Sequence, residues 1–525
     1  PGMAYAALAR CPVYGGKVAS FQGDAARSIP GVRDVVAIPG PAGKDAGAGP
    51  PAAVATVAVA VVADNSWAAI QGCRRLQVAW DEGPAAALGS DGIRALLAAR
   101  AATGGVTWRS EGDVALAVSS AASAGKRIEA VYEMPFLAHA PMEPGNTTAR
   151  VENGRCELWS PTQAPDRVQR AVAEALGLAR DAVTVHTTLL GGGFGRRLQV
   201  DYAVEAAKAA RAAGRPVKLV WSREDDMGHD FYRPASYHRL AGAVDRDGWP
   251  IALEHVFAAP SLAAVRHPKE AEATGRDPVV ENQAVVLYAI PNLKLSYAMA
   301  NTAVPIGPLR SVYAAQAAFP TECFLDELAA AGGKDPLAVR RRLLAADREI
   351  GSDDGKLSTA RLRGALELAA AKAGWGTPLP PGRFRGIACF PSFGTYVAEV
   401  AEVSLDPAAQ GGFRVERVVV AIDCGTVVNP DGLEAQMEGA VAYGLSAARH
   451  SAITIRKGRA EQGNFDGFEV LRLPDMPRVE VHAVPSAAPP SGAGEPGMPP
   501  LAPAVANALF AATGKRVRTL PLRVA

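Results

Sequence analysis

The segment Leu190-Gly191-Gly192-Gly193-Phe194-Gly195-Arg196-Arg197 is the part of the sequence that decides the fold. It follows a stretch rich in β-branched residues, 182–189, and precedes a helical pattern at 201–213, so a strand leads through a glycine loop into a helix. Glycines let a backbone approach a ligand closely, and the free N–H groups of such a loop, with two arginines beside them, favour an anion. From the spacing alone, a plain glycine-rich turn is equally compatible.

Two common nucleotide-binding motifs are excluded. The dinucleotide pattern G-x-G-x-x-G, counted from Gly191, needs a glycine where Arg196 stands. No Gly-Lys-Ser/Thr follows the loop, so it is not a P-loop. A phosphate-bearing cofactor of another kind is left open, and a Rossmann-type dehydrogenase is the weakest of the alternatives.

Outward from the loop, strands and helices alternate over 127–335. The patterns predict strands at 127–135, 182–189 and 217–221, and helices at 167–176, 201–213, 319–331 and 335–345. After a Pro/Gly-rich break at 376–382 they predict strands at 397–405 and 413–423 and helices at 433–445 and 502–513. The first 85 residues read as a small α/β unit with a buried strand in the apolar run 52–63, and 86–126 as a linker with one helix at 92–101. We therefore expect the α+β class, with domains at 1–85, 127–335 and 336–525.

The composition is that of a soluble globular protein: 525 residues, 49% hydrophobic and 21% charged. A formal net charge of +2 gives no reason to expect nucleic acid as a partner, and no apolar run is long enough to span a bilayer. None of the six cysteines forms a C-x-x-C pair and no H-E-x-x-H occurs, so neither a zinc site nor an iron–sulfur cluster is encoded. Any metal must therefore arrive on a cofactor and not through protein ligands.

A second segment, Gly492-Ala493-Gly494-Glu495-Pro496-Gly497, holds one carboxylate between glycines and a proline. Pro496 favours an extended backbone at Glu495, and the small neighbours leave its side chain accessible. A stiff loop that presents a single acid suits a general base. Taken alone, a surface glutamate in a loop is the commoner case.

Three further segments are weak on their own. Arg310, in Pro308-Leu309-Arg310-Ser311-Val312-Tyr313 and ahead of Gln316, could form only a surface ion pair. Asp423-Cys424-Gly425 could be only a turn, and Cys424 has no basic partner in sequence that would make it a nucleophile. His139 and Glu143 could be a buried pair at a strand end.

In combination, the motifs resemble the large subunit of the xanthine oxidase family of molybdenum hydroxylases, in the isoquinoline 1-oxidoreductase β-subunit branch that includes bacterial aldehyde dehydrogenases. The motifs are, in order, His-Ala-Pro-Met-Glu-Pro (139–144), Ser-Pro-Thr-Gln (160–163), the glycine loop, Asp-Cys-Gly (423–425) and Gly-Glu-Pro-Gly (494–497). The resemblance runs from Pro1 to Leu520. It implies a hammerhead-like domain at 1–85 and molybdopterin-binding domains at 127–335 and 336–525, the second completed by a missing N-terminal segment or a second chain.

The resemblance also assigns roles to residues. Glu495 would be the catalytic base beside the metal, and Gln163 would contact the molybdenum ligands. Backbone amides of Gly192, Gly193, Phe194 and Gly195 would surround the metal and pterin. The cofactor side of the pocket would be held by Arg310, Gln316 and Gly494, and the substrate by Phe393, Leu198 and Val312.

The implied reaction is hydroxylation of an aldehyde or an N-heteroaromatic carbon with oxygen from water. The cofactor would be molybdenum–molybdopterin in its cytosine dinucleotide form. Electrons would leave through a [2Fe–2S] cluster on a separate small subunit, with a cytochrome c as a further acceptor. The Met-Gly-Gln-Gly segment that lines the cofactor in the family does not occur here, so we expect a further chain to supply that half.

A second departure from the family and one alternative qualify this interpretation. Purine-oxidising members have a glutamate where Leu198 stands, which disfavours xanthine as the substrate. The alternative from another class is a non-catalytic cofactor-binding paralogue or assembly subunit, against which Glu495 speaks. The chain opens with Pro1-Gly2-Met3, so we take it for a fragment or a processed subunit, with a periplasmic location expected and the cytoplasm as the alternative.

Overall fold

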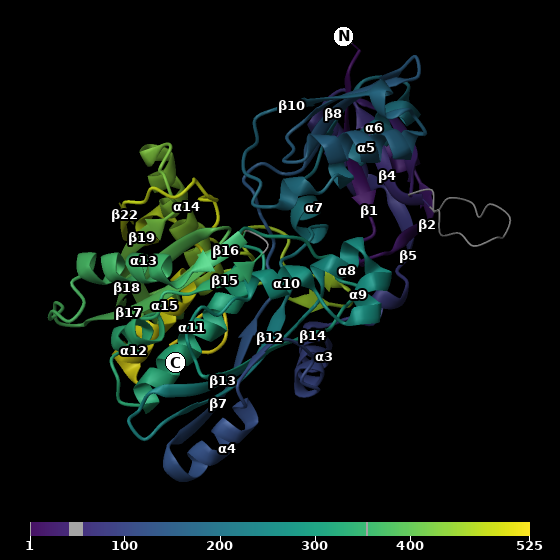
Figure 1. Ribbon diagram of the computed structural model, residues 1–525. Coiled ribbons are helices and arrows are strands. Elements are labelled where there is room, and N and C mark those ends of the chain that lie inside the picture. Colours follow the sequence, from purple (N-terminus) through teal and green to yellow (C-terminus); the bar gives the residue numbers. More distant parts are fainter. Residues whose placement is uncertain (1, 41–55, 353–354, 525) are drawn as a thin grey trace.

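Three large β-sheets and the helices packed on them make up the protein, seen in a computed structural model that describes residues 2–40, 56–352 and 355–524 (Figure 1). Both helices and strands run through the whole chain, as the predicted α+β class requires. The loops that carry the motifs described above leave these sheets and meet between them.

A seven-stranded mixed sheet joins segments that are far apart in the sequence. β1 lies parallel to β11, with Ala4 opposite Val217, and antiparallel to β4. The predicted unit 1–85 therefore does not close on itself, because its strands share a sheet with strands from 146–220. The order across the sheet is β10 (Val183–Thr187), β9 (Arg155–Ser160), β8 (Asn146–Glu152), β11 (Val217–Val220), β1 (Ala4–Arg10), β4 (Thr56–Ala63) and β3 (Val32–Pro39).

Two helices flank the glycine loop on this sheet. The helix α6 (Asp201–Ala213) has the bounds that the sequence predicts, and its buried alanines let it lie close to the strands. Beside it packs α5 (Pro165–Leu176), while α2 (Ser66–Arg75) packs on β1 and β4. The predicted strand in 52–63 is β4, and residues 52–55 lie outside the described part of the chain.

A five-stranded sheet corrects the prediction for 86–126. This segment was expected to be a linker with one helix at 92–101. The helix is present as α3 (Ser90–Ala102), but β6 (Val106–Glu111) and α4 (Val114–Ala124) follow it, and β6 pairs with β14 at the edge of the sheet. The strand order is β6, β14 (Asn292–Met299), β13 (Pro250–Ala259), β12 (Ser236–Val244) and β7 (Lys126–Met134). The long helix α11 (Ala314–Ala331) packs against it at Gly242, where an added Cβ would lie 2.8 Å from Phe324.

A four-stranded sheet carries the C-terminal motifs, in the order β17 (Arg383–Ser392), β18 (Thr395–Leu405), β19 (Phe413–Asp423) and β22 (Arg478–Ala483). One face is covered by α13 (Thr359–Lys372) and the other by α15 (Leu501–Thr513). At Gly386 the backbone of α15 comes so close that a Cβ would lie 2.2 Å from the nitrogen of Ala508. The helix α14 (Pro430–Arg449) packs on α15 and β22.

The remaining elements are short and connect the three sheets. They are α1 (Asp24–Arg27), α7 (Arg223–Gly228), α8 (Leu262–Arg266), α9 (Pro268–Thr274), α10 (Pro278–Gln283) and α12 (Pro336–Leu343), with the strand pairs β2 (Lys17–Gln22) and β5 (Gln77–Asp81), β15 (Glu349–Ser352) and β16 (Gly355–Ser358), and β20 (Ile455–Arg456) and β21 (Arg459–Ala460). In the described part of the chain, no helix combines the length and the apolar character that a membrane crossing needs.

Candidate cofactor and active site

The glycine loop is held in a shape that larger residues could not adopt. Gly192 and Gly195 have positive φ, 98° and 105°. A Cβ at Gly195 would lie 1.8 Å from the carbonyl oxygen of Pro308, and one at Gly193 would lie 2.6 Å from Oε1 of Gln163. Gln163 accepts a hydrogen bond from the N–H of Gly195 at 3.2 Å, so the motif at 160–163 holds the glycine loop in place. The glycines are required by these close approaches.

The loop also presents unused hydrogen-bond donors. The described residues supply no acceptor for the N–H groups of Gly192, Gly193 or Phe194. Gly192 and Phe194 line a cavity, while Gly193 is buried. Consecutive free N–H groups in a turn bind oxygen-bearing or anionic ligands.

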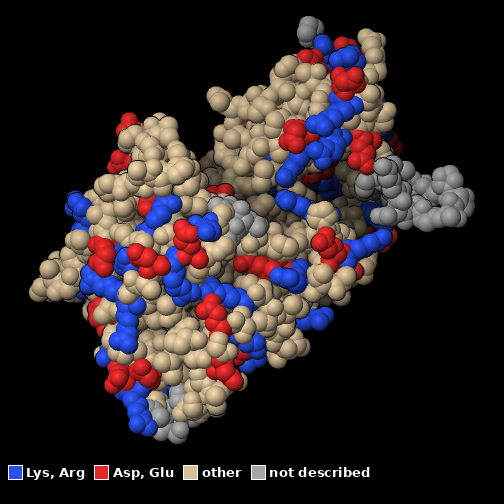
Figure 2. Space-filling view, viewed as in Figure 1, with Lys and Arg blue, Asp and Glu red and all other residues tan. Residues whose placement is uncertain are grey.

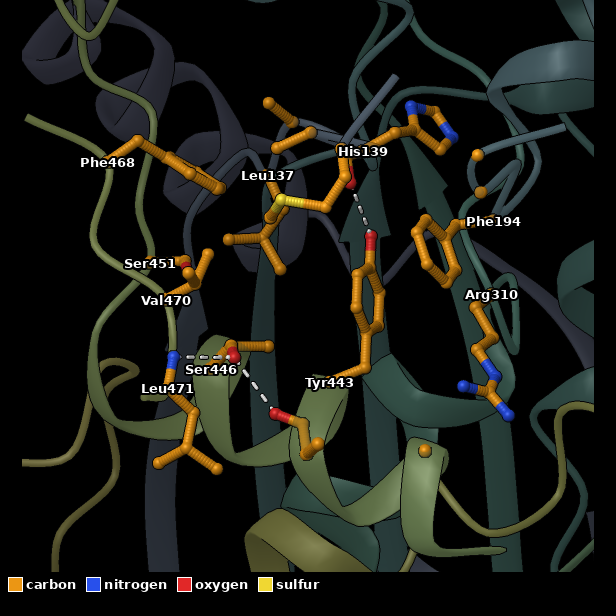
Figure 3. A pocket seen from close by; sticks show the side chains of 18 residues that line it. Leu137, His139, Phe194, Arg310, Tyr443, Ser446, Ser451, Phe468, Val470 and Leu471 are labelled. Atoms are coloured by element: carbon orange, nitrogen blue, oxygen red, sulfur yellow. Dashed lines mark hydrogen bonds between the residues drawn. The ribbon is translucent and has the colours of Figure 1, made fainter. Parts of the chain in front are cut away.

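A cavity of about 420 Å³ opens beside this loop (Figure 3). Phe194 stacks on Tyr443 of α14, with ring centroids 4.5 Å apart, and the Tyr443 hydroxyl donates to the carbonyl of His139 at 3.0 Å. The wall consists of Leu137, Ala138, His139, Ala140, Met142, Gly191, Gly192, Phe194, Arg310, Gly439, Ala442, Tyr443, Ser446, Ala447, Ser451, Phe468, Val470 and Leu471. Apolar side chains with a few polar groups form most of it, which is the usual lining of a cofactor pocket.

Arg310 ties the glycine loop to the C-terminal motifs. Its backbone N–H donates to the carbonyl of Phe194 at 2.9 Å. Its guanidinium donates to the carbonyl of Gly494 at 2.7 Å, and to the carbonyl and Oε1 of Gln436, each at 3.0 Å. Burial lowers the pKa of Arg310, and its guanidinium joins the loop of Gly494 to helix α14. The surface ion pair that its sequence allowed is not what it forms.

Glu495 is half-buried and is held by the loop 308–312 that carries Arg310. The backbone N–H of Ser311 donates to Oε2 of Glu495 at 2.6 Å, and the Ser311 hydroxyl donates to the carbonyl of Glu495 at 2.7 Å. Burial raises the pKa of Glu495, and the Ser311 hydrogen bond and the charge of Arg310 oppose that rise. A raised pKa in a glutamate that a backbone donor orients is the usual environment of a catalytic base.

Residues with strained backbone lie around Glu495 and the glycine loop. Phe194, Ser311, Val312 and Phe393 are non-glycine residues with φ of 55°, 77°, 45° and 53°. Each such residue costs on the order of 1–3 kcal/mol. Phe393 lies in the turn between β17 and β18, and its carbonyl accepts the N–H of Gly492 at 3.2 Å, so this turn adjoins the Glu495 loop. Strain of this kind is maintained at functional sites.

The buried charges behind the glycine loop differ from the pair that the sequence suggested. His139 pairs with Asp230 and not with Glu143, its Nδ1 lying 2.9 Å from Oδ1 of Asp230. Glu143 accepts the N–H of Gly191 at 2.8 Å and so anchors the start of the loop. Arg196 forms two hydrogen bonds to Asp201, at 3.0 and 2.7 Å, from a fully buried position.

The remaining residues singled out in the sequence lie in three different surroundings. Gln316 is fully buried in α11, donates to the carbonyl of Pro234 at 2.8 Å, and does not line the cavity. Leu198 and Val312 are half-buried, Leu198 directly after the glycine loop and Val312 against the main core. Asp423 accepts from Arg361 and from the N–H of Gly425, and burial raises the pKa of Cys424.

Sequence reasoning missed Ser311, Tyr443 and the partner of His139. Ser311 sits inside a motif that was noticed, yet its contact with Glu495 joins residues far apart in the chain.

Among the described residues, no cluster of His, Cys, Asp and Glu could hold a metal ion. Charges of both signs are interspersed on the face shown in Figure 2.

Two family models match the chain, and both describe a molybdopterin cofactor-binding domain, at residues 99–344 and 367–477. The chain is 31% identical to the isoquinoline 1-oxidoreductase subunit beta of Brevundimonas diminuta over 544 residues, covering 100% of this chain and 65% of that protein. It is 32% identical to the membrane-bound aldehyde dehydrogenase [pyrroloquinoline-quinone] of Gluconacetobacter polyoxogenes over 496 residues, covering 89% and 62%. The chain thus spans less than two thirds of these relatives.

Solved structures share the fold. Quinoline 2-oxidoreductase from Pseudomonas putida 86 superposes with a TM-score of 0.79 at 16% identity, over 99% of this chain and 93% of that chain. Aldehyde oxidoreductase from Desulfovibrio gigas gives a TM-score of 0.76 at 18% identity, over 98% and 76%. With the two cofactor-binding domains and the motif order, the chain belongs to the xanthine oxidase family of molybdenum hydroxylases, as part of the molybdopterin-binding subunit.

Proposed function

We propose that this chain forms the molybdopterin-binding half-site of an enzyme that oxidises an aldehyde or an N-heteroaromatic carbon with oxygen from water. The observation that carries the proposal is the meeting of the glycine loop with Glu495. Arg310 joins them, because its N–H bonds the carbonyl of Phe194 and its guanidinium bonds the carbonyl of Gly494. A ligand cradle and an oriented acid are thereby held in one unit.

The residues present fit the cofactor. Free N–H groups of Gly192, Gly193 and Phe194 suit its oxygen and phosphate groups, and the Gln163 amide lies directly behind them. When bound, the molybdenum–molybdopterin group supplies a two-electron acceptor and activates water at neutral pH. We propose the cytosine dinucleotide form, as the branch resemblance implies.

Glu495 would take up the proton that the attacking water oxygen loses. It does so only as the carboxylate, and its raised pKa makes that carboxylate a stronger base than an exposed glutamate. The N–H of Ser311 holds Oε2, which leaves Oε1 to accept the proton. The balanced reaction for an aldehyde is addition of one water with release of two electrons and two protons.

The proposed substrate is apolar around the reacting carbon. Phe393, Val312 and Leu198, the residues assigned to the substrate by resemblance, carry no charge, which disfavours a purine. The names of the relatives, isoquinoline 1-oxidoreductase and aldehyde dehydrogenase, support these two substrate classes. Steady-state turnover of an aliphatic aldehyde series and of isoquinoline by the same preparation would separate the classes.

We further propose that another polypeptide segment covers the mouth of the cavity. Leu189 is 98% exposed and Met142 67% exposed, both beside the glycine loop, and such an apolar rim favours a protein contact. The proposed partners are a segment carrying Met-Gly-Gln-Gly and a small [2Fe–2S] subunit, with a cytochrome c as the further acceptor. No cluster ligands occur in this sequence, so electrons need such a subunit.

Elemental analysis of the purified native complex tests the proposal. We expect molybdenum together with about two irons per copy, as one [2Fe–2S] cluster requires. A complex with all subunits present but without molybdenum would contradict it, and pyrroloquinoline quinone recovered in its place would point to the other cofactor that one relative's name carries. Turnover in ¹⁸O-labelled water should place the label in the product.

The variant Glu495→Gln tests the base. Glutamine can still accept the Ser311 N–H but cannot accept the proton, so we expect turnover to fall about a thousandfold or more with molybdenum retained. The matched control is Glu434→Gln, at an exposed position near the start of α14, which should leave kcat unchanged. Normal activity in Glu495→Gln would remove Glu495 from the mechanism.

A further inference from the structure

His139 is a buried side chain at the junction of three loops. Its exposed fraction is 1%, and so is that of Asp230. Nε2 of the ring lies 3.1 Å from the carbonyl oxygen of Pro308, while Nδ1 lies 2.9 Å from Oδ1 of Asp230. A carbonyl oxygen can only accept a hydrogen bond, so Nε2 must carry a hydrogen.

Nδ1 of His139 faces an acceptor as well. Burial alone would raise the pKa of Asp230, but the charge of His139, its ring and backbone hydrogen bonds and the nearby Arg196 hold it below its usual value. Asp230 is therefore ionised and only accepts. Both ring nitrogens of His139 thus face a group that only accepts a hydrogen bond. The other charged groups nearby are Asp226, beside Asp230, and Arg310, which lines the same cavity wall.

The Pro308 carbonyl is the point through which His139 acts on the site. It lies so close to Gly195 that a Cβ there would be 1.8 Å from it and 3.2 Å from Nε2 of His139. Along the same loop, the N–H of Arg310 bonds the glycine loop and the N–H of Ser311 bonds Glu495. The carbonyl of His139 also receives the hydroxyl of Tyr443, whose ring stacks on Phe194.

We infer that His139, paired with Asp230, is a positioning residue that fixes the 308–312 loop against the glycine loop and thereby holds the carboxylate of Glu495. The inference rests on the proposed role of Glu495 as the base. His139 itself is not catalytic, because both of its ring nitrogens are engaged within the protein. The strained backbone at Ser311 and Val312 gives the loop a reason to need such a restraint, since strained segments relax once their contacts are removed.

Two isosteric variants separate the two hydrogen bonds of the ring. In His139→Gln the side-chain amide nitrogen occupies the place of Nε2 and can still donate to Pro308. In His139→Asn it occupies the place of Nδ1 and donates only to Asp230. We expect kcat to fall about 100-fold in His139→Asn, as misplacement of a catalytic group does. KM should change little, and His139→Gln should recover most of kcat.

A second readout does not depend on activity. In the native complex, hydrogen exchange at the Ser311 amide, followed by mass spectrometry of a peptide covering 308–312, should be at least tenfold faster in His139→Asn and close to wild type in His139→Gln. The control is His238→Asn, because His238 is equally buried and bonds His255 and Ser236 at 2.9 Å away from these loops. It should leave kcat and this exchange unchanged.

Equal kcat values for the Gln and Asn variants, or a loss of kcat in His139→Asn without faster exchange, would overturn the inference. If the wild-type complex shows no hydroxylase activity, the proposed function fails. The exchange rates then decide the positioning role alone, because unchanged exchange in His139→Asn refutes it.

Discussion

Ser311 holds Glu495 at both ends: its N–H donates to the carboxylate at 2.6 Å and its hydroxyl to the backbone carbonyl at 2.7 Å. One residue therefore sets both the direction of the acid and the path of the loop that carries it. The geometry explains how a glutamate that follows a glycine, the most flexible of residues, can still be placed accurately.

The pH dependence of turnover should follow Glu495. Because the base works as the carboxylate and burial raises its pKa, kcat/KM should fall as the pH drops through a pKa above that of an ordinary glutamate, about 4.3. A pH profile of kcat/KM with a neutral substrate measures this limb. An acidic limb at or below the ordinary value would be inconsistent with a buried base.

Gly195→Ala should disrupt the junction of the two loops. The added Cβ would lie 1.8 Å from the Pro308 carbonyl, in a residue that also has positive φ. We expect loss of bound molybdenum and a lowered free energy of unfolding. The control Gly214→Ala has φ of 61° but open space around it, so it should cost only about 1–2 kcal/mol and retain molybdenum. Similar results for the two variants would show that the close contact is unimportant.

Arg310→Lys should reduce kcat while the fold is kept. A lysine cannot reproduce the fork that bonds Gly494 and Gln436 together, and each lost charged hydrogen bond is worth about 1.5–3 kcal/mol. We expect a decrease of about tenfold or more, measured at saturating substrate. Arg170→Lys, at a residue with a 65% exposed side chain, is the matched control and should be indistinguishable from wild type. Full activity in Arg310→Lys would show that the fork is dispensable.

Glu399 should make stability depend on pH. It is fully buried in β18, and the described residues offer its carboxyl no hydrogen-bond partner, so burial raises its pKa well above the usual value. Its contribution to stability is present at low pH and is lost as the pH rises through the raised pKa. Glu399→Gln should therefore increase the free energy of unfolding at pH 8, by roughly 1.4 kcal/mol for each unit of pKa shift crossed, and change it little at pH 5.

Glu402→Gln is the control for this prediction, because the same substitution on the same strand should have the opposite sign. Glu402 lies 3.2 Å from Arg417 and 3.6 Å from Arg385, and removing its charge leaves these cations without their anion. Denaturant unfolding at both pH values measures the two variants. Destabilisation by Glu399→Gln at pH 8 would contradict an uncompensated buried acid.

Elements with strong periodicity could be predicted, and those decided by tertiary packing could not. The helix 201–213 and the strand 413–423 have the expected bounds, since alternation and capping signals are local. The edge strand β6 is largely exposed and carries no clear alternation, so a linker was expected there. The helix α11 begins at Ala314, whereas the sequence predicts a start at 319. The start is hard to predict because residues 314–329 are buried and show no polar face, and because Pro320 lies inside the helix.

For the site, the sequence supplied the motifs but not their contacts. The structure brings the glycine loop, Arg310 and Glu495 together, whereas Gln316 is buried and donates to the carbonyl of Pro234. The pairing of His139 with Asp230 joins two elements that nothing in the sequence connects. Hydrogen bonds between distant loops depend on the docking of whole sheets, which no local pattern encodes.

The place of β1 in the seven-stranded sheet has a consequence for how the protein is made. β1 lies between β4 and β11, and Ala4 is paired with Val217. During synthesis, one edge of β1 therefore stays uncovered until more than two hundred further residues have left the ribosome. An open strand edge is prone to wrong pairing, so the nascent chain is most exposed to mispairing during that interval.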